Sequence, residues 1–476
     1  MKKNKNITSI STSLLYVAAV AIPNIIGFIT LPIYSSVLTP GDYGLISYTN
    51  SYTNFIATLS SLCLNIYFLR NYSSAKDKKF FTGAMFGNLI IWNVILFILE
   101  SIIFSLAFYF ANVQVPFYPY MFLTLLNSFF ISFEIIPLRY FRIRGEAVKY
   151  FVRMVSKSLM TVALMIYFLF VARIGVMSRF YSNLIPSIIF AVVFIIYMKK
   201  NTEISIDKGI MKEGLKFSLP FVPSEMVSQF SNLFLNSTIL NLISINYLGI
   251  YSIGTTMASV IGVISSALIM TFETDVYLAA EKEDFAKILV RVKNISFAVM
   301  LAVSLAGGML VREVSMIFLS EKYWEAWPIV QILSLAYPIE ILTSIYYNIN
   351  VIEKHRFAPL ISKIVALISQ IVICFVLFSV MGDSAFGWSV VSKSFVAWLV
   401  LVLCSNKKAK YGMKIGRDVF LLGSMYCLMQ LSNLLNPMGF IISVFGKIII
   451  FIIAVVILMW VYEINLKELV IKLLRK

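Results

Sequence analysis

Residues 448–461 read Ile-Ile-Ile-Phe-Ile-Ile-Ala-Val-Val-Ile-Leu-Met-Trp-Val, an unbroken apolar run without a charged side chain. A strand of a membrane barrel would alternate apolar and polar residues, so this run favours a helix. Roughly 20 such residues cross the hydrocarbon core of a bilayer. Comparable stretches follow one another from Leu14 to Tyr462, and the sequence therefore predicts an all-α polytopic membrane protein.

The composition supports this class and excludes several functions. The 476 residues are 60% hydrophobic and 13% charged, with a mean hydropathy of +0.88, which is too apolar for a soluble protein of this length. The four cysteines lie far apart, without the spacing of a metal site or a disulfide framework. The sequence also lacks a phosphate-cradling glycine loop and a nucleophile with a base, so we expect no enzyme, metal or cofactor.

Apolar windows bounded by charged or turn residues predict about 14 membrane-spanning helices. Their expected ranges are 12–36, 43–69, 82–110, 118–141, 152–172, 179–198, 217–241, 250–277, 293–319, 327–351, 358–380, 385–404, 417–434 and 439–462. The basic N-terminus followed by an apolar run resembles a signal peptide, but the run continues to Leu38 and further spans follow it. We therefore expect this run to remain as the first helix.

Basic residues cluster in alternate loops. They fall in 2–5, 70–79, 139–153, 199–216, 282–293, 354–356, 407–417 and the C-terminal tail. The opposite side has only Arg173, Arg179, Arg312 and Lys322. By the positive-inside rule, this asymmetry predicts an even number of spans and two cytoplasmic termini. The net charge of +17 is then loop charge beside anionic lipid headgroups, and no nucleic-acid partner is needed.

The two halves of the chain match weakly at a constant shift. Tyr140-Phe141 aligns with Tyr346-Tyr347, Phe151 with Phe357, and Ser156-Lys157 with Ser362-Lys363 at a shift of 206, and Gly44-Leu45 aligns with Gly249-Ile250 at 205. This shift corresponds to six spans, so the sequence predicts two parallel six-helix lobes. We assign 1–205 to the N-terminal lobe, 206–405 to the C-terminal lobe, and 406–476 to two extra helices and a cytoplasmic tail.

Prolines interrupt the first helix of each predicted lobe. They are Pro23 and Pro32 in one lobe, and Pro220 and Pro223 in the other. Proline removes a backbone donor and kinks a helix. These residues are candidate hinges lining an alternating-access cavity, or ordinary prolines of membrane helices.

Residues 31–44, Leu-Pro-Ile-Tyr-Ser-Ser-Val-Leu-Thr-Pro-Gly-Asp-Tyr-Gly, resemble the first-loop signature of the polysaccharide exporter family, the Wzx-type flippases of the MOP superfamily. Within it, Thr39-Pro40-Gly41-Asp42 has turn chemistry, and Thr39 or Asp42 can cap the following helix. Residues 319–328, Leu-Ser-Glu-Lys-Tyr-Trp-Glu-Ala-Trp-Pro, resemble the family's loop before helix 10.

This resemblance implies a flippase of the bacterial inner membrane. Its expected cargo is an undecaprenyl-diphosphate-linked oligosaccharide for O-antigen or capsule, moved by alternating access and coupled to H⁺ or Na⁺. A polysaccharide polymerase and chain-length machinery are its expected partners, besides membrane lipids. One feature departs from the related lipid II flippases, which carry arginines in their first helix: here no charge lies between Lys5 and Asp42.

Charged residues within membrane spans are costly and should face a cavity or a partner. Lys393 lies near the centre of its predicted helix, while Lys157 and Lys363 are equivalent in the repeat. These lysines are candidates for binding a diphosphate, as compact point charges. Glu100, Glu134 and Glu340 are the candidate carboxylates, either neutralising the lysines or carrying a coupling proton.

Gln229, Asn232 and Asn236 share one face of the seventh predicted helix. They are candidates for sugar recognition or for hydrogen bonds between helices.

Other classes of membrane protein fit less well. A polymerase would have a long external loop, and a scaffold would not need charges in mid-membrane. The main alternative is a multidrug or small-solute cation antiporter of the same superfamily, against which the membrane lysines argue.

Overall fold

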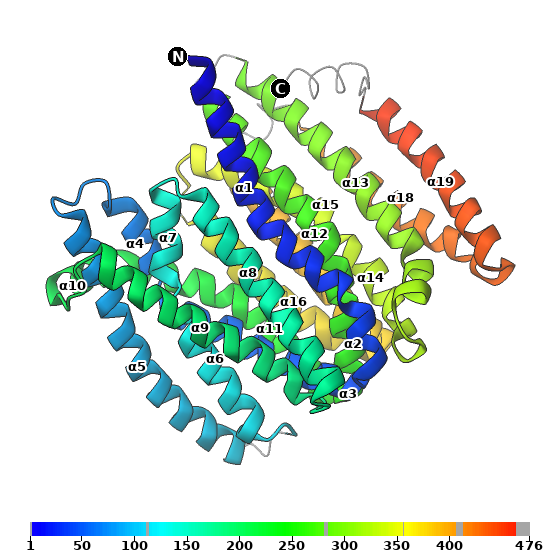
Figure 1. The fold of residues 1–476 in the computed structure, drawn as a ribbon. Coiled ribbons are helices and arrows are strands. Elements are labelled where there is room, and N and C mark those ends of the chain that lie inside the picture. Colours follow the sequence, from blue (N-terminus) through cyan, green and yellow to red (C-terminus); the bar gives the residue numbers. More distant parts are fainter. Residues whose placement is uncertain (1, 111–113, 280–283, 356, 406–412, 463–476) are drawn as a thin grey trace. The chain divides into compact units, whose positions relative to one another are not determined.

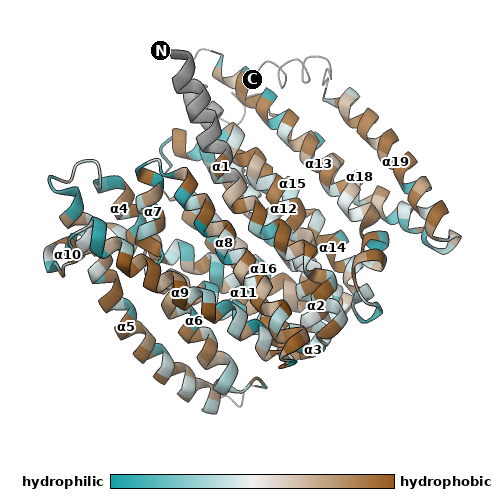
Figure 2. Cartoon of the chain, in the orientation of Figure 1, coloured by the Kyte–Doolittle hydropathy of each residue, from teal (hydrophilic) through white to brown (hydrophobic). Residues whose placement is uncertain are grey.

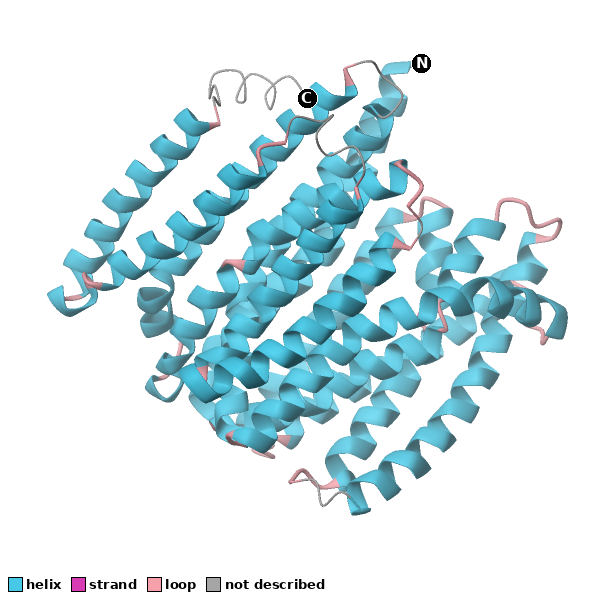
Figure 3. Cartoon of the chain, turned by 180° about the vertical axis from the view of Figure 1, so that it is seen from behind, coloured by secondary structure: helices cyan, strands magenta, loops and turns pink. Residues whose placement is uncertain are grey.

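The computed structural model describes residues 2–110, 114–279, 284–355, 357–405 and 413–462. Every regular element among them is a helix (Figure 3). These residues include 12 segments that are long and apolar enough to cross a membrane. The prediction of an all-α, multi-pass membrane protein is therefore confirmed.

The chain divides into two compact units, Met1–Ser252 and Ile253–Lys476, and the division falls inside α12. The helices up to this division are α1 (Lys2–Ile29), α2 (Leu31–Val37), α3 (Pro40–Ser61), α4 (Leu64–Asn71), α5 (Lys78–Phe110), η1 (Phe117–Met121), α6 (Phe122–Ser132), α7 (Ile135–Ile143), α8 (Ala147–Ile166), η2 (Tyr167–Val171), α9 (Met177–Asn201), α10 (Lys208–Ser218), η3 (Leu219–Phe221), α11 (Val222–Leu242) and α12 (Ile245–Ala279), labelled in Figure 1 where there is room.

The second unit contains the rest of α12 and the remaining elements. They are α13 (Phe285–Phe318), η4 (Glu321–Ala326), α14 (Trp327–Ser334), α15 (Ala336–Ile352), α16 (Ala358–Met381), α17 (Ser384–Cys404), α18 (Ile415–Asn433), η5 (Asn436–Met438) and α19 (Phe440–Val461). The long helix α13 packs against α14, α15, α18 and α19. Its side chains Phe297, Leu301 and Leu305 belong to the apolar core of this unit.

Each of the 14 predicted ranges falls on a helix or on a run of consecutive helices. Two of the ranges fall on α3–α4 and η3–α11, which are not among the 12 apolar segments because serine, threonine and asparagine recur in them. These two polar helices contact each other: α11 packs on α3, and the Asn236 side chain donates to the Ser47 carbonyl at 3.4 Å. Polar side chains in a span find partners on a neighbouring helix in this way.

Arg153 and Lys293 stand at the ends of two predicted basic stretches and at the starts of the predicted spans 152–172 and 293–319. In the structure Arg153 lies in α8 and Lys293 in α13, and both are buried. Each pairs with a carboxylate, which offsets the cost of a charge inside a span. Lys282, Arg356, residues 407–410 and the C-terminal tail lie outside the described residues.

The signature at residues 39–44 builds the start of α3. The Thr39 side chain accepts from the Asp42 backbone N–H at 3.2 Å, and the Asp42 carboxylate accepts from the Thr39 backbone N–H at 2.9 Å. This capping box confirms the predicted cap and satisfies donors that the first turn leaves free. Gly44 has a separate role, because a Cβ atom there would lie 1.9 Å from the Ile245 carbonyl oxygen.

Gly249 is the repeat partner of Gly44, and it shows the same close contact. A Cβ atom on Gly249 would lie 1.8 Å from the Pro40 carbonyl oxygen and 2.9 Å from the Gly44 nitrogen. The starts of α3 and α12 therefore touch at the two glycines that the repeat aligns. Only glycine permits this backbone approach.

The short helices α4, α7 and α10 gather at one end of the first unit (Figure 1), where hydrophilic residues are frequent (Figure 2). Most of α10 falls in a stretch predicted to be cytoplasmic, whereas α4 and α7 lie at the predicted cytoplasmic ends of the ranges 43–69 and 118–141. In contrast, α19 is hydrophobic over most of its length (Figure 2), and residues such as Ile449, Ile453 and Trp460 are exposed on it. Such a surface fits contact with lipid.

Candidate functional site

The first unit contains a buried charge cluster formed by Glu134, Arg153 and Lys157. The Glu134 carboxylate forms an ion pair with the Arg153 guanidinium. It also accepts a hydrogen bond from Lys157 Nζ at 2.9 Å. Glu134 is 3% exposed and Arg153 is 9% exposed. The structure thus joins two predicted site residues, Glu134 and Lys157, and adds Arg153.

Local geometry explains why these side chains meet. Glu134 lies at the break between α6 and α7, where the chain leaves one helix and begins the next. Arg153 and Lys157 are four residues apart on α8, so they point from the same face of that helix. The Arg153 guanidinium also lies 5.5 Å from the centre of the Phe190 ring of α9, a favourable cation–π contact.

The cluster holds two cations and one carboxylate. Transferring ions out of water costs several kcal/mol each, and pairing offsets that cost. One carboxylate balances only one cation, so the cluster has an excess of positive charge inside a span. Such a group can attract an anion such as a phosphate.

The second unit brings together Glu340 of α15 and Lys393 of α17. The two side chains interact electrostatically. Glu340 is exposed and Lys393 is half-buried, although both lie in helices long and apolar enough to span a membrane. Glu340 follows Glu134 by 206 residues, which is the shift of the repeat. The carboxylates are therefore equivalent in the repeat, whereas their lysine partners come from non-equivalent helices.

The other candidate lysine is Lys363, and the other candidate carboxylate is Glu100. Lys363 is half-buried in α16, next to Ser362, whose hydroxyl donates to the Ala397 carbonyl at 2.8 Å. Glu100 is 7% exposed in α5, and its Oε1 atom has no hydrogen-bond partner among the described residues. Among the residues that the structure describes, no cation pairs with Glu100, whereas Glu134 pairs with Arg153 and Lys157.

On the predicted polar face of α11, the structure gives a hydrogen bond to another helix for Asn236. Asn236 bonds to α3 through Ser47, as described above, whereas Asn232 is exposed and Gln229 is half-buried.

The four prolines mark interruptions in different ways. Pro23 lies inside α1, whereas Pro32 and Pro223 occupy the first turns of α2 and α11, and Pro220 lies in η3.

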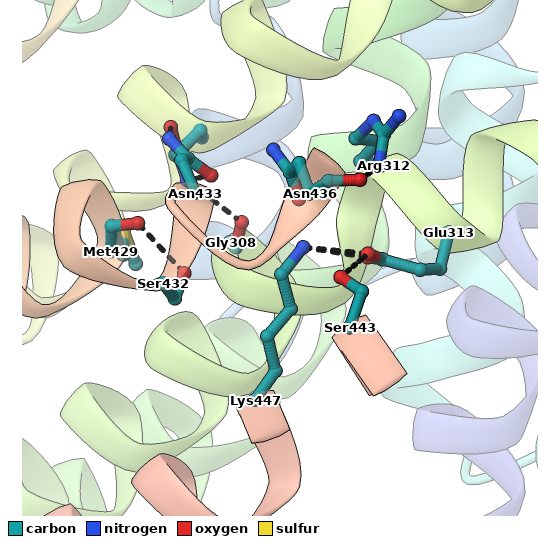
Figure 4. Close-up of polar contacts among 10 residues, drawn as sticks. Gly308, Arg312, Glu313, Met429, Ser432, Asn433, Asn436, Ser443 and Lys447 are labelled. Carbon is teal, nitrogen blue, oxygen red and sulfur yellow. Dashed lines mark hydrogen bonds and ion pairs between the residues drawn. The ribbon is translucent and has the colours of Figure 1, made fainter. Parts of the chain in front are cut away.

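Sequence reasoning missed two buried ion pairs that attach α18 and α19 to α13. Lys293 Nζ lies 2.5 Å from the Asp418 carboxylate, which also accepts a hydrogen bond from the Tyr462 hydroxyl. At the other end of α13, Lys447 and Ser443 point from α19 to Glu313 (Figure 4), with distances of 2.7 and 2.6 Å to its Oε1 atom.

A sequence signal for the second pair was available. Ser443 and Lys447 are four residues apart in a run that is otherwise apolar, which places two polar groups on one face of the helix. Their partner was not apparent, because Glu313 lies 130 or more residues earlier in the chain.

Comparisons with known proteins agree with this architecture. A family described as polysaccharide biosynthesis protein matches residues 9–273. Lipid II flippase MurJ in an inward closed conformation is similar in structure, with a TM-score of 0.72 and 14% identity over 94% of this chain and 98% of that one.

A multidrug resistance MATE family transporter of the MOP superfamily in an inward-facing conformation is also similar, with a TM-score of 0.66 and 17% identity over 86% of this chain and 98% of that one. No curated protein sequence matches the chain. At these identities the structural likeness establishes the MOP fold.

Proposed function

Because the chain belongs to the polysaccharide biosynthesis protein family, we propose that it is a flippase for an undecaprenyl-diphosphate-linked oligosaccharide. It moves this repeat unit from the cytoplasmic to the outer leaflet of the bacterial inner membrane, where O-antigen or capsule is assembled. Transport proceeds by alternating access and is coupled to H⁺ or Na⁺. Both chain termini lie in the cytoplasm, and the polymerase and chain-length machinery receive the product.

The observation that carries this proposal is the cluster of Glu134, Arg153 and Lys157. A diphosphate is the most strongly charged part of the cargo, and it needs cations and hydrogen-bond donors within the membrane. The cluster offers both, with one cation more than its carboxylate neutralises. Arg153 presents a planar fork for phosphate oxygens, and Lys157 adds a compact charge.

The second unit adds a charge pair that anion binding can rearrange. Lys393 interacts with Glu340, and a phosphate competes with the Glu340 carboxylate for this lysine. The exposure of Glu340 within a span fits a hydrated cavity, because a charge facing hydrocarbon would be costly. Lys363, in the same unit as Lys393, is a further cation that we assign to phosphate binding.

We assign the remaining candidates by their positions. The lobes 1–205 and 206–405 move against each other about the hinges Pro23, Pro32, Pro220 and Pro223. Gln229, Asn232 and Asn236 offer amides for sugar hydroxyls. Glu134, Glu340 and Glu100 balance charge or carry the coupling ion.

A flipping assay with the Lys157→Gln variant tests this proposal. The purified protein in liposomes is given a fluorescent undecaprenyl-diphosphate oligosaccharide, and its transfer between leaflets is followed with a membrane-impermeant quencher. We expect the flipping rate to fall by about tenfold or more, as the loss of a hydrogen bond to a charged group costs about 1.5–3 kcal/mol. Lys157→Arg should retain most of the rate.

The design separates function from folding. Lys157→Gln leaves Glu134 paired one-to-one with Arg153, so the buried cluster becomes neutral and the fold should persist. An unchanged flipping rate in this variant would remove Lys157 from the site. Failure of the wild-type protein to move the lipid-linked sugar would reject the flippase proposal.

Cation antiport is the alternative, because the MOP fold is shared with multidrug transporters. Organic-cation efflux from the same liposomes distinguishes the two functions. Excess positive charge at Arg153 and Lys157 would repel such a substrate, so we expect no efflux.

A further inference from the structure

Glu100 lies on the inward face of a helix whose other face is exposed. On α5, Asn93, Leu96, Glu100 and Phe108 are buried, whereas the apolar residues between them are largely exposed. The helical spacing of these residues puts them on one stripe that packs against the first unit. Glu100 is about ten residues, or about 15 Å, from the end of α5, which is about half the thickness of a hydrocarbon core.

The elements facing this stripe supply no cation at this depth. Tyr52 of α3 contacts Phe104 one turn beyond Glu100, and the Ser60 carbonyl accepts from Asn93 two turns before it. Between those contacts α3 carries no charged residue, and its only charge is Asp42 at its start. Phe97 contacts Phe122 and Phe129 of α6, a helix without any charged residue.

The other elements that pack on α5 present their charges elsewhere. Arg139 and Arg142 of α7, and the lysines of α10, belong to the hydrophilic end of the unit where α5 begins (Figures 1 and 2). The end of α9, with Lys199 and Lys200, leads into residues 203–205, whose carbonyls contact Gly83 and Gly87 in the first turns of α5. The segment η1 contributes only the tyrosines 118 and 120.

Glu100 Oε1 is buried without a hydrogen-bond partner among the described residues. The Ser101 hydroxyl, the next residue of α5, and the Asn127 Oδ1 atom of α6 are unpartnered in the same way. An ionised carboxylate adds only acceptors to such surroundings, whereas a protonated one adds an O–H donor. An isolated charge buried in hydrocarbon is also far more costly than a neutral carboxyl group.

We propose that Glu100 is a proton-binding site within the membrane, occupied by a proton in this conformation. Ion-paired Glu134 has no such need, because Arg153 and Lys157 stabilise its ionised form. Proton release from Glu100 then requires a conformation in which water reaches α5. Its role as the group that couples transport to a proton gradient rests on the proposed function, but its proton occupancy does not.

Dicyclohexylcarbodiimide tests the occupancy directly. This apolar reagent adds to a protonated carboxyl group, and the resulting O-acylisourea rearranges to a stable N-acylurea that contains all atoms of both reactants. The full-length protein in liposomes is treated at pH 7, and modified glutamates are found by peptide mass spectrometry. We expect modification at Glu100 at this pH, where an exposed glutamate is ionised, and little at Glu134.

The Glu100→Gln variant should lose this adduct and keep the rest of the labelling pattern. Absence of an adduct at Glu100, with labelling of Glu134 or exposed glutamates instead, would overturn the proposal. Protection of Glu100 by Na⁺ at constant pH would also overturn it, in favour of a sodium site.

A transport experiment distinguishes proton binding at Glu100 from the proposed flippase function. We expect Glu100→Gln to abolish cargo accumulation driven by a pH gradient. Gradient-driven accumulation in that variant would overturn the coupling role, whereas wild-type protein that moves no lipid-linked sugar would refute only the flippase proposal.

Discussion

At the residue scale, the cluster around Glu134 makes a prediction about stability. Glu134→Gln removes the only carboxylate that faces Arg153 and Lys157 in the described cluster, leaving two buried cations uncompensated. Removing one partner of a buried ion pair costs about 3–5 kcal/mol. We expect a clear fall in the thermal unfolding midpoint of the detergent-purified protein.

The double variant Glu134→Gln, Lys157→Gln supplies the control, because it leaves only one uncompensated cation. It should be more stable than Glu134→Gln alone. With the Lys157→Gln variant and the wild-type protein, these free energies of unfolding complete a double-mutant cycle that gives the coupling energy of the pair. Equal midpoints for both variants would mean that Lys157 does not depend on Glu134.

Part of this site was predictable from single residues. Searching apolar spans for charges identified Glu134, Lys157, Glu340 and Lys393 because each one interrupts a long hydrophobic run. Pairing was not predictable, since Lys393 takes its partner from α15 and Lys157 from the break before α7, and only packing brings these segments together. Arg153 was not predicted as a site residue because it follows a cluster of loop charges.

At the element scale, the ion pairs of α13 predict how α18 and α19 are held. Lys293 and Glu313 lie 20 residues, or about 30 Å, apart on α13, so α18 and α19 are attached near its two ends. A protein truncated after Cys404 keeps both charges but loses Asp418 and Lys447. We expect it to accumulate poorly in the membrane, because each unpaired charge costs at least about 2.5 kcal/mol there.

Neutralising the two charges that the truncation leaves unpaired should restore the amount of the truncated chain. With Lys293→Met and Glu313→Gln added, its amount in the membrane fraction, measured by immunoblot, should approach that of the full-length protein. Normal accumulation of the unmodified truncated chain would show that these pairs are not needed to retain α13.

The elements themselves were predictable because the lipid environment requires continuous apolar runs. The polar helices α3 and α11, which are not among the 12 apolar segments, were still predicted as helices, since charged or turn residues bound them on both sides. The positions at which helices break inside spans were harder to predict from the sequence. The chain bends at Leu62-Cys63, where both residues adopt positive φ angles without any glycine to mark the place. Such a bend depends on tertiary packing rather than on local preference.

At the scale of the whole molecule, the repeat stays a prediction, and the residues that it aligns can be compared. Gly44 and Gly249 touch, and Glu134 and Glu340 each interact with a lysine of their own unit. The compact units nevertheless divide within α12, because α11 packs on α3 of the first unit. Sequence similarity records the order of helices, whereas compactness depends on which helices touch, so the two divisions need not coincide.

The orientation of the whole chain gives the last prediction. If both termini are cytoplasmic, the loop positions Tyr118 and Met438 face outward, and Ile206 and Phe357 face inward; all four side chains are more than half exposed. Each is replaced by cysteine singly, after Cys63, Cys374, Cys404 and Cys427 have been removed. An impermeant thiol reagent should label the first two in intact spheroplasts, and the other two only after permeabilisation. The positions sample both units, so one miscounted span would exchange the expected sides of every later position. Seven predicted spans separate Ile206 from Met438. Labelling of Ile206→Cys and Met438→Cys from the same side would therefore contradict this odd count, and full reversal would place the termini outside.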